Sequence, residues 1–179
     1  MRGTAMTARD LRLLGDPVLR TECDAVTQFD DAVGRLVDDL LENVLLPGRA
    51  GLAAPQIGVS LAVFSYYVDG MHGYVINPVV VETSGEYDGL EGCLSIPGIT
   101  APCQRAMRTV VTGVDRNGDP VTVEGTGELS RCLQHETDHL RGVLFIDRLA
   151  GPDRKEVLGE LRRVGVHELS ASPGARRVP

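Results

Sequence analysis

The chain has 179 residues, a length that suits one domain, and its 42% hydrophobic and 24% charged residues are typical of a folded globular protein. Its 25 acidic and 18 basic side chains leave a net charge of −7, which argues against a general DNA- or RNA-binding role. Its longest apolar run is a few residues, far below the roughly 20 that a membrane span needs, so we expect no membrane segment.

The N-terminal stretch 1–14 contains charged side chains and lacks the apolar core of a signal peptide. We therefore expect a cytoplasmic protein, in which a cysteine serves as a metal ligand or nucleophile more often than as half of a disulfide. The chain has four cysteines, Cys23, Cys93, Cys103 and Cys132.

An amphipathic helix is predicted over residues 30–46, where apolar side chains recur with the helical period. Asp30 can cap its start, and a Pro-Gly pair follows its end. A turn at 16–20 precedes this helix, and a loop of small residues, 51–58, follows it.

Strands are predicted in the middle of the chain. The segments 61–68 and 74–81 are rich in strand-forming residues and are separated by an Asp-Gly turn. Pro78 indicates that the second of these strands lies at a sheet edge or is interrupted. The segments 108–115 and 121–124 flank a second turn and form a predicted hairpin.

Two further helices are predicted, over 128–141 and 152–166, and Gly142 follows the first as a C-terminal cap. The last residues, 170–179, are rich in Ser, Pro, Gly and Arg and are predicted to be a disordered tail. Helices and strands do not alternate regularly, so we predict an α+β fold. Antiparallel sheets would pack around the helix 128–141, with an N-terminal and a C-terminal helix, in a single domain over 1–169.

The segment His135-Glu136-Thr137-Asp138-His139 is an H-E-x-x-H motif inside a predicted helix. Residues four apart lie on one helix face, so both imidazoles can bind one metal ion, and Glu136 can reach a metal-bound water as general base. A catalytic zinc-like site needs a third protein ligand. The spacing His-x-x-Gly-x-x-His would place a third histidine at position 145, which holds Phe145. The remaining candidates are Cys93 upstream and Glu156 or Glu160 on the last helix.

Three segments, G-L-A-A-P-Q at 51–56, E-G-C-L-S at 91–95 and Q-H-E-x-D-H-L at 134–140, occur in an order and spacing that resemble the peptide deformylase family. The resemblance covers roughly residues 11–165. It implies a metallohydrolase that removes the formyl group from N-formylmethionyl nascent peptides and releases formate. It also implies Fe²⁺ as the metal, with Zn²⁺, Ni²⁺ or Co²⁺ as substitutes, and an association with the ribosome through the last helix and the Arg-rich tail.

The resemblance assigns roles to single residues. Cys93, His135 and His139 would bind the metal, Glu136 would transfer protons, and Gln56 with the backbone N–H of Leu94 would stabilise the oxyanion. The residues expected near the substrate are Arg49, Ala50, Gly51, Glu91 and Arg131. Gly51 would let the substrate backbone come close, and Cys23, Cys103 and Cys132 are expected to be structural.

Side chains around these segments carry further expectations. Asp138 is expected to pair with a basic residue such as Arg105, Glu91 to support the cysteine loop, and Gln134 to bind backbone.

The chain departs from the family pattern at two places. Arg49 stands where many members have glycine and is expected at the cleft rim. Glu128 and Arg131 replace apolar residues near the methionine pocket, where they either make its mouth polar or pair with each other.

Three alternatives compete with deformylase activity. A gluzincin-like peptidase would use Glu156 or Glu160 but would leave Gln56 and Cys93 without roles. A non-catalytic binding protein would be favoured by the loss of a ligand or of Glu136, and all are present. A redox role lacks a C-x-x-C motif.

Overall fold

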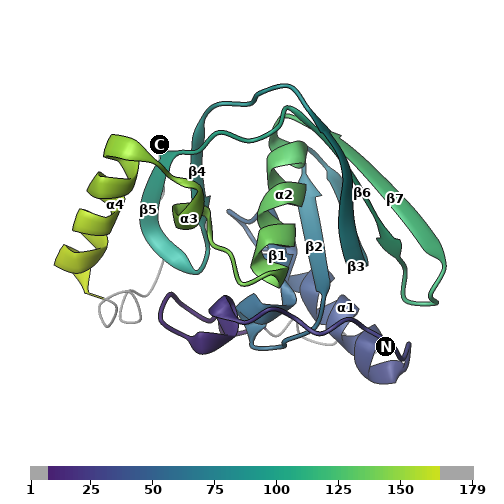
Figure 1. Ribbon diagram of the computed structural model, residues 1–179. Coiled ribbons are helices and arrows are strands. Elements are labelled where there is room, and N and C mark those ends of the chain that lie inside the picture. Colours follow the sequence, from purple (N-terminus) through teal and green to yellow (C-terminus); the bar gives the residue numbers. More distant parts are fainter. Residues whose placement is uncertain (1–7, 166–179) are drawn as a thin grey trace.

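The structure is a computed structural model that describes residues 8–165. A five-stranded antiparallel sheet, in the order β1-β2-β3-β6-β7, and a separate two-stranded sheet of β4 and β5 lie on either side of helix α2 (Figure 1). The helices are α1 (Asp31–Val44), α2 (Glu128–Leu140), α3 (Phe145–Arg148) and α4 (Gly151–Val164), and the strands are β1 (Gly51–Ala53), β2 (Val63–Val68), β3 (Met71–Ser84), β4 (Leu90–Cys93), β5 (Ile96–Pro102), β6 (Arg108–Val114) and β7 (Pro120–Thr126).

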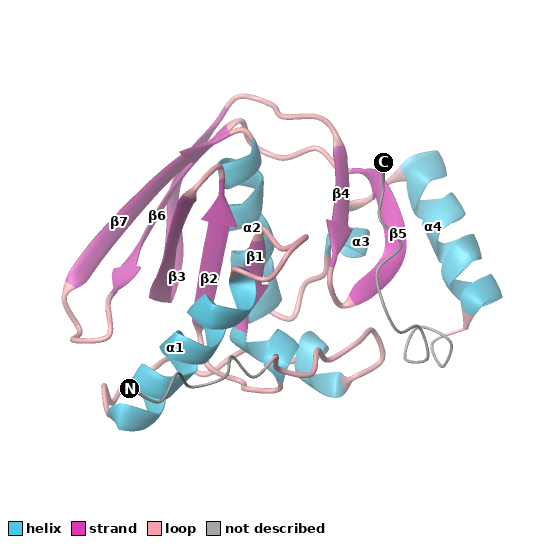
Figure 2. Ribbon diagram, turned by 180° about the vertical axis from the view of Figure 1, so that it is seen from behind, coloured by secondary structure: helices cyan, strands magenta, loops and turns pink. Residues whose placement is uncertain are grey.

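Helix α1 lies across one face of the large sheet (Figure 2). Asp30 caps it, because its carboxylate accepts hydrogen bonds from the backbone N–H groups of Ala32 and Val33, an interaction that typically contributes about 1 kcal/mol. The predicted helix is thus confirmed within two residues at each end. Its buried face packs on the sheet through Val33, Leu36, Val37, Leu40 and Val44.

Strand β3 lies between β2 and β6, so the structure supports the interrupted alternative for this strand and not the edge alternative. The register of β3 with β6 shifts between Ile76 and Val79, where Asn77 adopts a φ of 51°. Pro78 lies inside this shift, where the ladder is already broken and a missing N–H is tolerated.

Helix α2 is buried along nearly its whole length because it lies between the two sheets. Leu129 and Leu133 pack against the face of the large sheet opposite α1, together with Phe64 and Val111. The helix ends as predicted, because Gly142 follows it with a φ of 70°. The α+β fold with antiparallel sheets around this central helix is confirmed.

Strands β1, β4 and β5 are absent from the expectations above, which place a loop at 51–58. The structure forms β1 there, followed by a 3₁₀ helix at Ala54–Ile57. These strands are short or contain glycine and proline, so their own preference for a strand is weak. They form because β1 pairs with β2, and β4 pairs with β5. Side chains of β5 pack with side chains of α3 and α4 in a hydrophobic cluster that is separate from the apolar contacts of α1 and α2 with the large sheet.

The predicted last helix corresponds to α4. The predicted tail, 170–179, lies outside the described residues, as do the last four residues of the predicted domain. Over residues 8–165, no helix is long and apolar enough to cross a membrane.

Candidate functional site

The three candidate ligand residues come together where the end of β4 meets α2. His135 and His139 lie one turn apart on α2, and their Nε2 atoms are 3.2 Å from each other. Cys93 ends β4, and its Sγ lies 3.3 Å from Nε2 of His139. All three ligand atoms lie within 4.8 Å of one another, which makes this group a candidate Cys/His/His metal site.

The geometry of this group fits a tetrahedral metal ion. One sulfur at about 2.3 Å and two nitrogens at about 2.0–2.1 Å from an ion would lie about 3.3–3.6 Å apart, close to the distances found here. His135 is oriented for this role, because its Nδ1 lies 2.6 Å from Oε1 of Glu91 and its Nε2 therefore points to the other ligands. Glu156 and Glu160 lie on α4 and are not part of the group, and Phe145 packs its ring against His135.

Glu136 follows His135 on α2 and is buried against β1. Its Oε2 has no hydrogen-bond partner among residues 8–165, and burial raises the pKa of this carboxyl to about 7. Such a pKa suits a group that both accepts and donates a proton near neutral pH. A Cβ on Gly51 would lie 2.3 Å from Oε1 of Glu136, so only glycine at position 51 leaves room for the carboxylate. This requirement is invisible in the sequence, where Gly51 and Glu136 are far apart.

Gln56 is buried and held in a fixed orientation beside the cysteine. Its Oε1 accepts a hydrogen bond from the backbone N–H of Ala53 at 2.9 Å. Its Nε2 lies 3.2 Å from Oγ of Ser95 and 3.7 Å from Sγ of Cys93. Leu94 directly follows Cys93, at the turn between β4 and β5, so its backbone N–H belongs to the peptide bond after the cysteine. Both predicted oxyanion donors thus belong to segments that border the ligands.

A buried ion-pair network supports the histidine side of the site. Arg105 donates to both oxygens of Glu91, at 2.9 and 2.6 Å, and to Asp138 at 2.7 Å. Burial opposes ionisation of Glu91, but the hydrogen bonds from Arg105 and His135 outweigh it and lower its pKa to about 2. The expected pairing of Asp138 with Arg105 is confirmed. Arg148 of α3, which the sequence did not predict here, also donates to the carboxylate of Asp138.

Glu91 was expected both to support the cysteine loop and to contact substrate. Its carboxylate oxygens are engaged by Arg105 and His135, so the structure favours the supporting role. Gln134 binds the backbone N–H and C=O of Ala106, as predicted.

Arg49 turns toward the end of α1 instead of pointing freely into a cleft. Its Nη1 donates to the backbone C=O of Asn43 at 3.1 Å, and its backbone does not adopt a positive φ. Ala50 is exposed, and its C=O accepts a hydrogen bond from the thiol of Cys132 at 3.2 Å. Contact of Arg49 with substrate therefore stays a prediction, and its observed partner is α1.

Glu128 and Arg131 pair with each other, which confirms one of the two expectations for them, with 3.0 Å between Oε1 and Nη1. The guanidinium of Arg131 is buried and donates to the C=O of Leu90 rather than facing an open pocket mouth. This side chain thus joins α2 to the start of β4.

The four cysteines are free, in line with the expectation that no disulfide forms. Cys103 and Cys132 are buried and Cys23 is half-buried, and burial raises the pKa of each of the three thiols. These three thiols therefore remain protonated near neutral pH, whereas Cys93 lies among nitrogen ligands.

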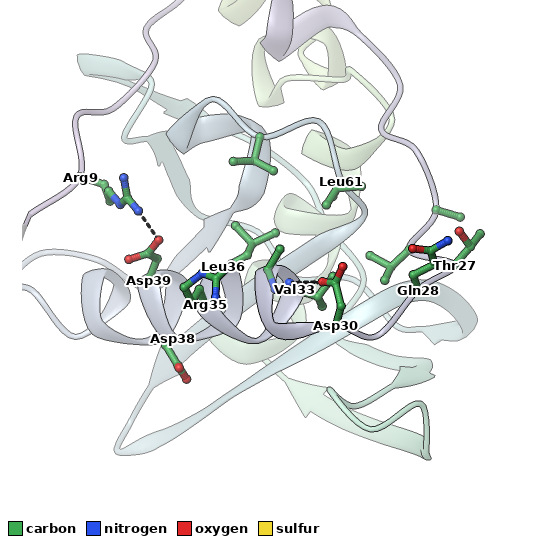
Figure 3. Close-up of a pocket in the computed structure, with 14 residues that line it drawn as sticks. Arg9, Thr27, Gln28, Asp30, Val33, Arg35, Leu36, Asp38, Asp39 and Leu61 are labelled. Atoms are coloured by element: carbon green, nitrogen blue, oxygen red, sulfur yellow. Dashed lines mark hydrogen bonds and ion pairs between the residues drawn. The ribbon is translucent and has the colours of Figure 1, made fainter.

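A cavity of about 630 Å³ lies away from these residues, along α1 (Figure 3). Arg9 borders one end of it and Thr27 the other, and carboxylates and aliphatic side chains of α1 form its floor. None of its lining residues is a candidate metal ligand or proton donor of the site described above. This cavity and the candidate chemistry are thus at different places.

Comparisons with known proteins agree with the geometry. Residues 8–155 match the family described as polypeptide deformylase. The chain is 54% identical over 159 residues to a peptide deformylase of Parafrankia sp., covering 88% of this chain and 87% of that protein. Among solved structures, it resembles the peptide deformylase of Thermus thermophilus with a TM-score of 0.84 and 37% identity, covering 93% and 100% of the two chains. It resembles that of Legionella pneumophila with a TM-score of 0.83 and 35% identity, covering 94% and 100%.

A family match over most of the chain, relatives above 50% identity and the same fold in solved relatives all point to one conclusion. The chain belongs to the peptide deformylase family, the metal-dependent enzymes that remove the N-formyl group from nascent peptides.

Proposed function

We propose that Cys93, His135 and His139 hold the catalytic metal ion and that Glu136 is the general base of deformylation. The observation that carries this proposal is a buried carboxylate with an unpartnered oxygen, placed on the helix that supplies two of the three candidate ligands. Cys93 would bind as a thiolate and both histidines as neutral imidazoles through Nε2.

Deformylation is the hydrolysis of an amide, in which the oxygen of water adds to the formyl carbon and the C–N bond then breaks. The products are formate and a free amine. In this scheme Glu136 takes a proton from the attacking water and later gives it to the leaving nitrogen. When bound, the metal ion supplies Lewis-acid chemistry, which lowers the pKa of water and polarises the carbonyl.

The negative charge that develops on the formyl oxygen needs fixed hydrogen-bond donors. We assign this role to the side-chain amide of Gln56 and the backbone N–H of Leu94. The bond from Ala53 to Oε1 of Gln56 supports the assignment, because it fixes the amide with its nitrogen toward Cys93. Donors that are oriented before the reaction stabilise the transition state more than mobile donors do.

For the metal we propose Fe²⁺, with Zn²⁺, Ni²⁺ or Co²⁺ as substitutes. One thiolate and two imidazoles suit these ions rather than magnesium or calcium. Elemental analysis of protein purified without oxygen tests this choice. Protein that comes out of the cell filled with zinc and without iron, and that is no more active after reloading with Fe²⁺, would contradict it.

We propose a cytoplasmic enzyme that meets its peptides near the ribosome. Support comes from α4, where Arg162 and Arg163 are exposed on the last turn. The other arginines of this expectation, Arg176 and Arg177, lie outside the described residues.

At the site, we propose that Ala50 and Gly51 border the path of the peptide backbone. Gly51 lies against the side chain of Glu136, and Ala50, the residue before it, is exposed.

The activity is tested by measuring formate release from formyl-Met peptides with anaerobically prepared, metal-loaded protein. We expect stoichiometric release of formate and of the free amine. Fully loaded, folded protein that releases no formate would contradict the assignment. A peptidase of the gluzincin type would instead cleave an internal peptide bond and leave the formyl group in place.

Replacing Gly51 by alanine is expected to lower kcat for formate release about 100-fold, because the new methyl group forces the Glu136 carboxylate out of place. The metal content should stay at the wild-type value, since Cys93, His135 and His139 are unchanged. Gly34→Ala in α1 is the matched control, because a Cβ there has no atom within 4 Å. A wild-type kcat in Gly51→Ala would show that the carboxylate does not need this space.

A further inference from the structure

Arg131 occupies a buried slot beside the candidate metal site. Only 9% of its side chain is exposed, and its guanidinium stacks over the ring of Tyr87 with 4.6 Å to the ring centre. Its Nη1 donates to the backbone C=O of Leu90 at 2.6 Å and lies 3.0 Å from Oε1 of Glu128. Gly89 completes the slot, since a Cβ there would lie 2.7 Å from Nη2.

These contacts connect the two elements that carry the candidate ligands. Arg131 lies on α2 one turn before His135, and Leu90 begins the strand β4 that ends at Cys93. One side chain therefore ties the sulfur-bearing strand to the nitrogen-bearing helix. The segment before β4 is held to the same helix, because the hydroxyl of Tyr87 donates to Glu128 at 2.6 Å.

We propose that Arg131 is a positioning residue that keeps β4 against α2 and thereby holds Cys93 in register with His135 and His139. Arg131 touches no ligand atom and acts through the backbone of Leu90. The inference rests on the metal site assigned above and adds the residue that fixes its two halves relative to each other.

The unpaired donors of Arg131 argue that this contact is more than a stabilising one. Its Nε and Nη2 are buried and have no hydrogen-bond partner in the described part of the chain. A buried charged group with unsatisfied donors is costly to the fold. Because Glu128, its ion-pair partner, is half exposed, replacing Arg131 leaves no buried charge behind, and an apolar side chain of similar length is expected to keep or raise stability. If Arg131 only stabilised the fold, replacing it would lower the unfolding midpoint and leave metal binding unchanged. A positioning role predicts weaker metal binding without a lower midpoint.

The test uses full-length protein loaded with Co²⁺, whose sulfur-to-cobalt charge-transfer band reports the Cys93 contact. For Arg131→Met we expect cobalt to leave for a chelator about tenfold faster than in the wild type, with a weaker or shifted charge-transfer band. The thermal unfolding midpoint of the metal-free variant should be unchanged or higher. Arg108→Met is the control, because Arg108 is also ion-paired, with Glu82 and Glu124, but lies on β6, which carries no candidate ligand.

A wild-type release rate and band in Arg131→Met would overturn the proposal, and so would an equal acceleration in Arg108→Met. If Arg131→Met does not fold, Arg131→Lys takes its place, because an ammonium keeps the charge but cannot reproduce the planar group that stacks on Tyr87 and binds the C=O of Leu90. Release at the wild-type rate in Arg131→Lys would then overturn the proposal. Failure of the metal assignment looks different, since the wild type itself would then lack the sulfur-to-cobalt band.

Discussion

Replacing Glu136 by glutamine is expected to lower kcat for formate release by about a hundred- to ten-thousand-fold while the bound metal is retained. The substitution keeps the size of the side chain, which fits against Gly51, but removes its ability to accept and donate the proton. General acid–base catalysis typically contributes an acceleration of this size. The measurement pairs formate release with metal content per chain on the same preparation.

Glu124→Gln on β7 is the control, because Glu124 is an exposed glutamate that pairs with Arg108 and is not part of the ligand group. It should release formate at the wild-type rate. If Glu136→Gln with full metal content released formate within a few-fold of the wild type, the proton would have to travel through another group. No other unpartnered buried carboxylate oxygen exists among residues 8–165 to take over this role.

The parts of this molecule that the sequence predicts are those in which the information is local. The H-E-x-x-H spacing predicts two imidazoles on one face of α2 without any knowledge of the remaining chain, and the structure brings their Nε2 atoms to 3.2 Å. The cap at Asp30 and the turn at Gly142 are equally local and lie where they were expected.

The parts that the sequence does not predict depend on contacts between distant segments. Strand β4 has little strand preference of its own, and Leu90 and Glu91 in it are bound by Arg131 and His135 of α2, more than 40 residues further along the chain. Glu136 lies against the backbone of Gly51, and Arg131 donates to the backbone C=O of Leu90. Both contacts join residues that are far apart in the sequence, so no hydrophobic periodicity predicts them. Resemblance to a family supplied Cys93 as third ligand, where residue spacing alone left Glu156 and Glu160 open.

Replacing Cys93 by alanine is expected to weaken metal binding more than 100-fold, because it removes one of three protein ligands. Loss of a group that only supports a ligand already lowers metal affinity about 10–100-fold. Activity should fall with metal occupancy and should return only in part at high metal concentration. The measurement is metal content after dialysis, together with the affinity for Co²⁺ in a competition titration.

Cys23→Ala is the matched control, since Cys23 is also a free, half-buried thiol but is not part of the ligand group. It should bind metal with wild-type affinity. Unchanged affinity in Cys93→Ala would mean that the third ligand lies elsewhere. Glu156 and Glu160 could then serve only if α4 left the core that it forms with β5 through Val157 and Leu161. Such a rearrangement would expose buried apolar surface, so metal retained in Cys93→Ala should be accompanied by a lower thermal unfolding midpoint. Loss of metal with an unchanged midpoint instead identifies Cys93 as the ligand.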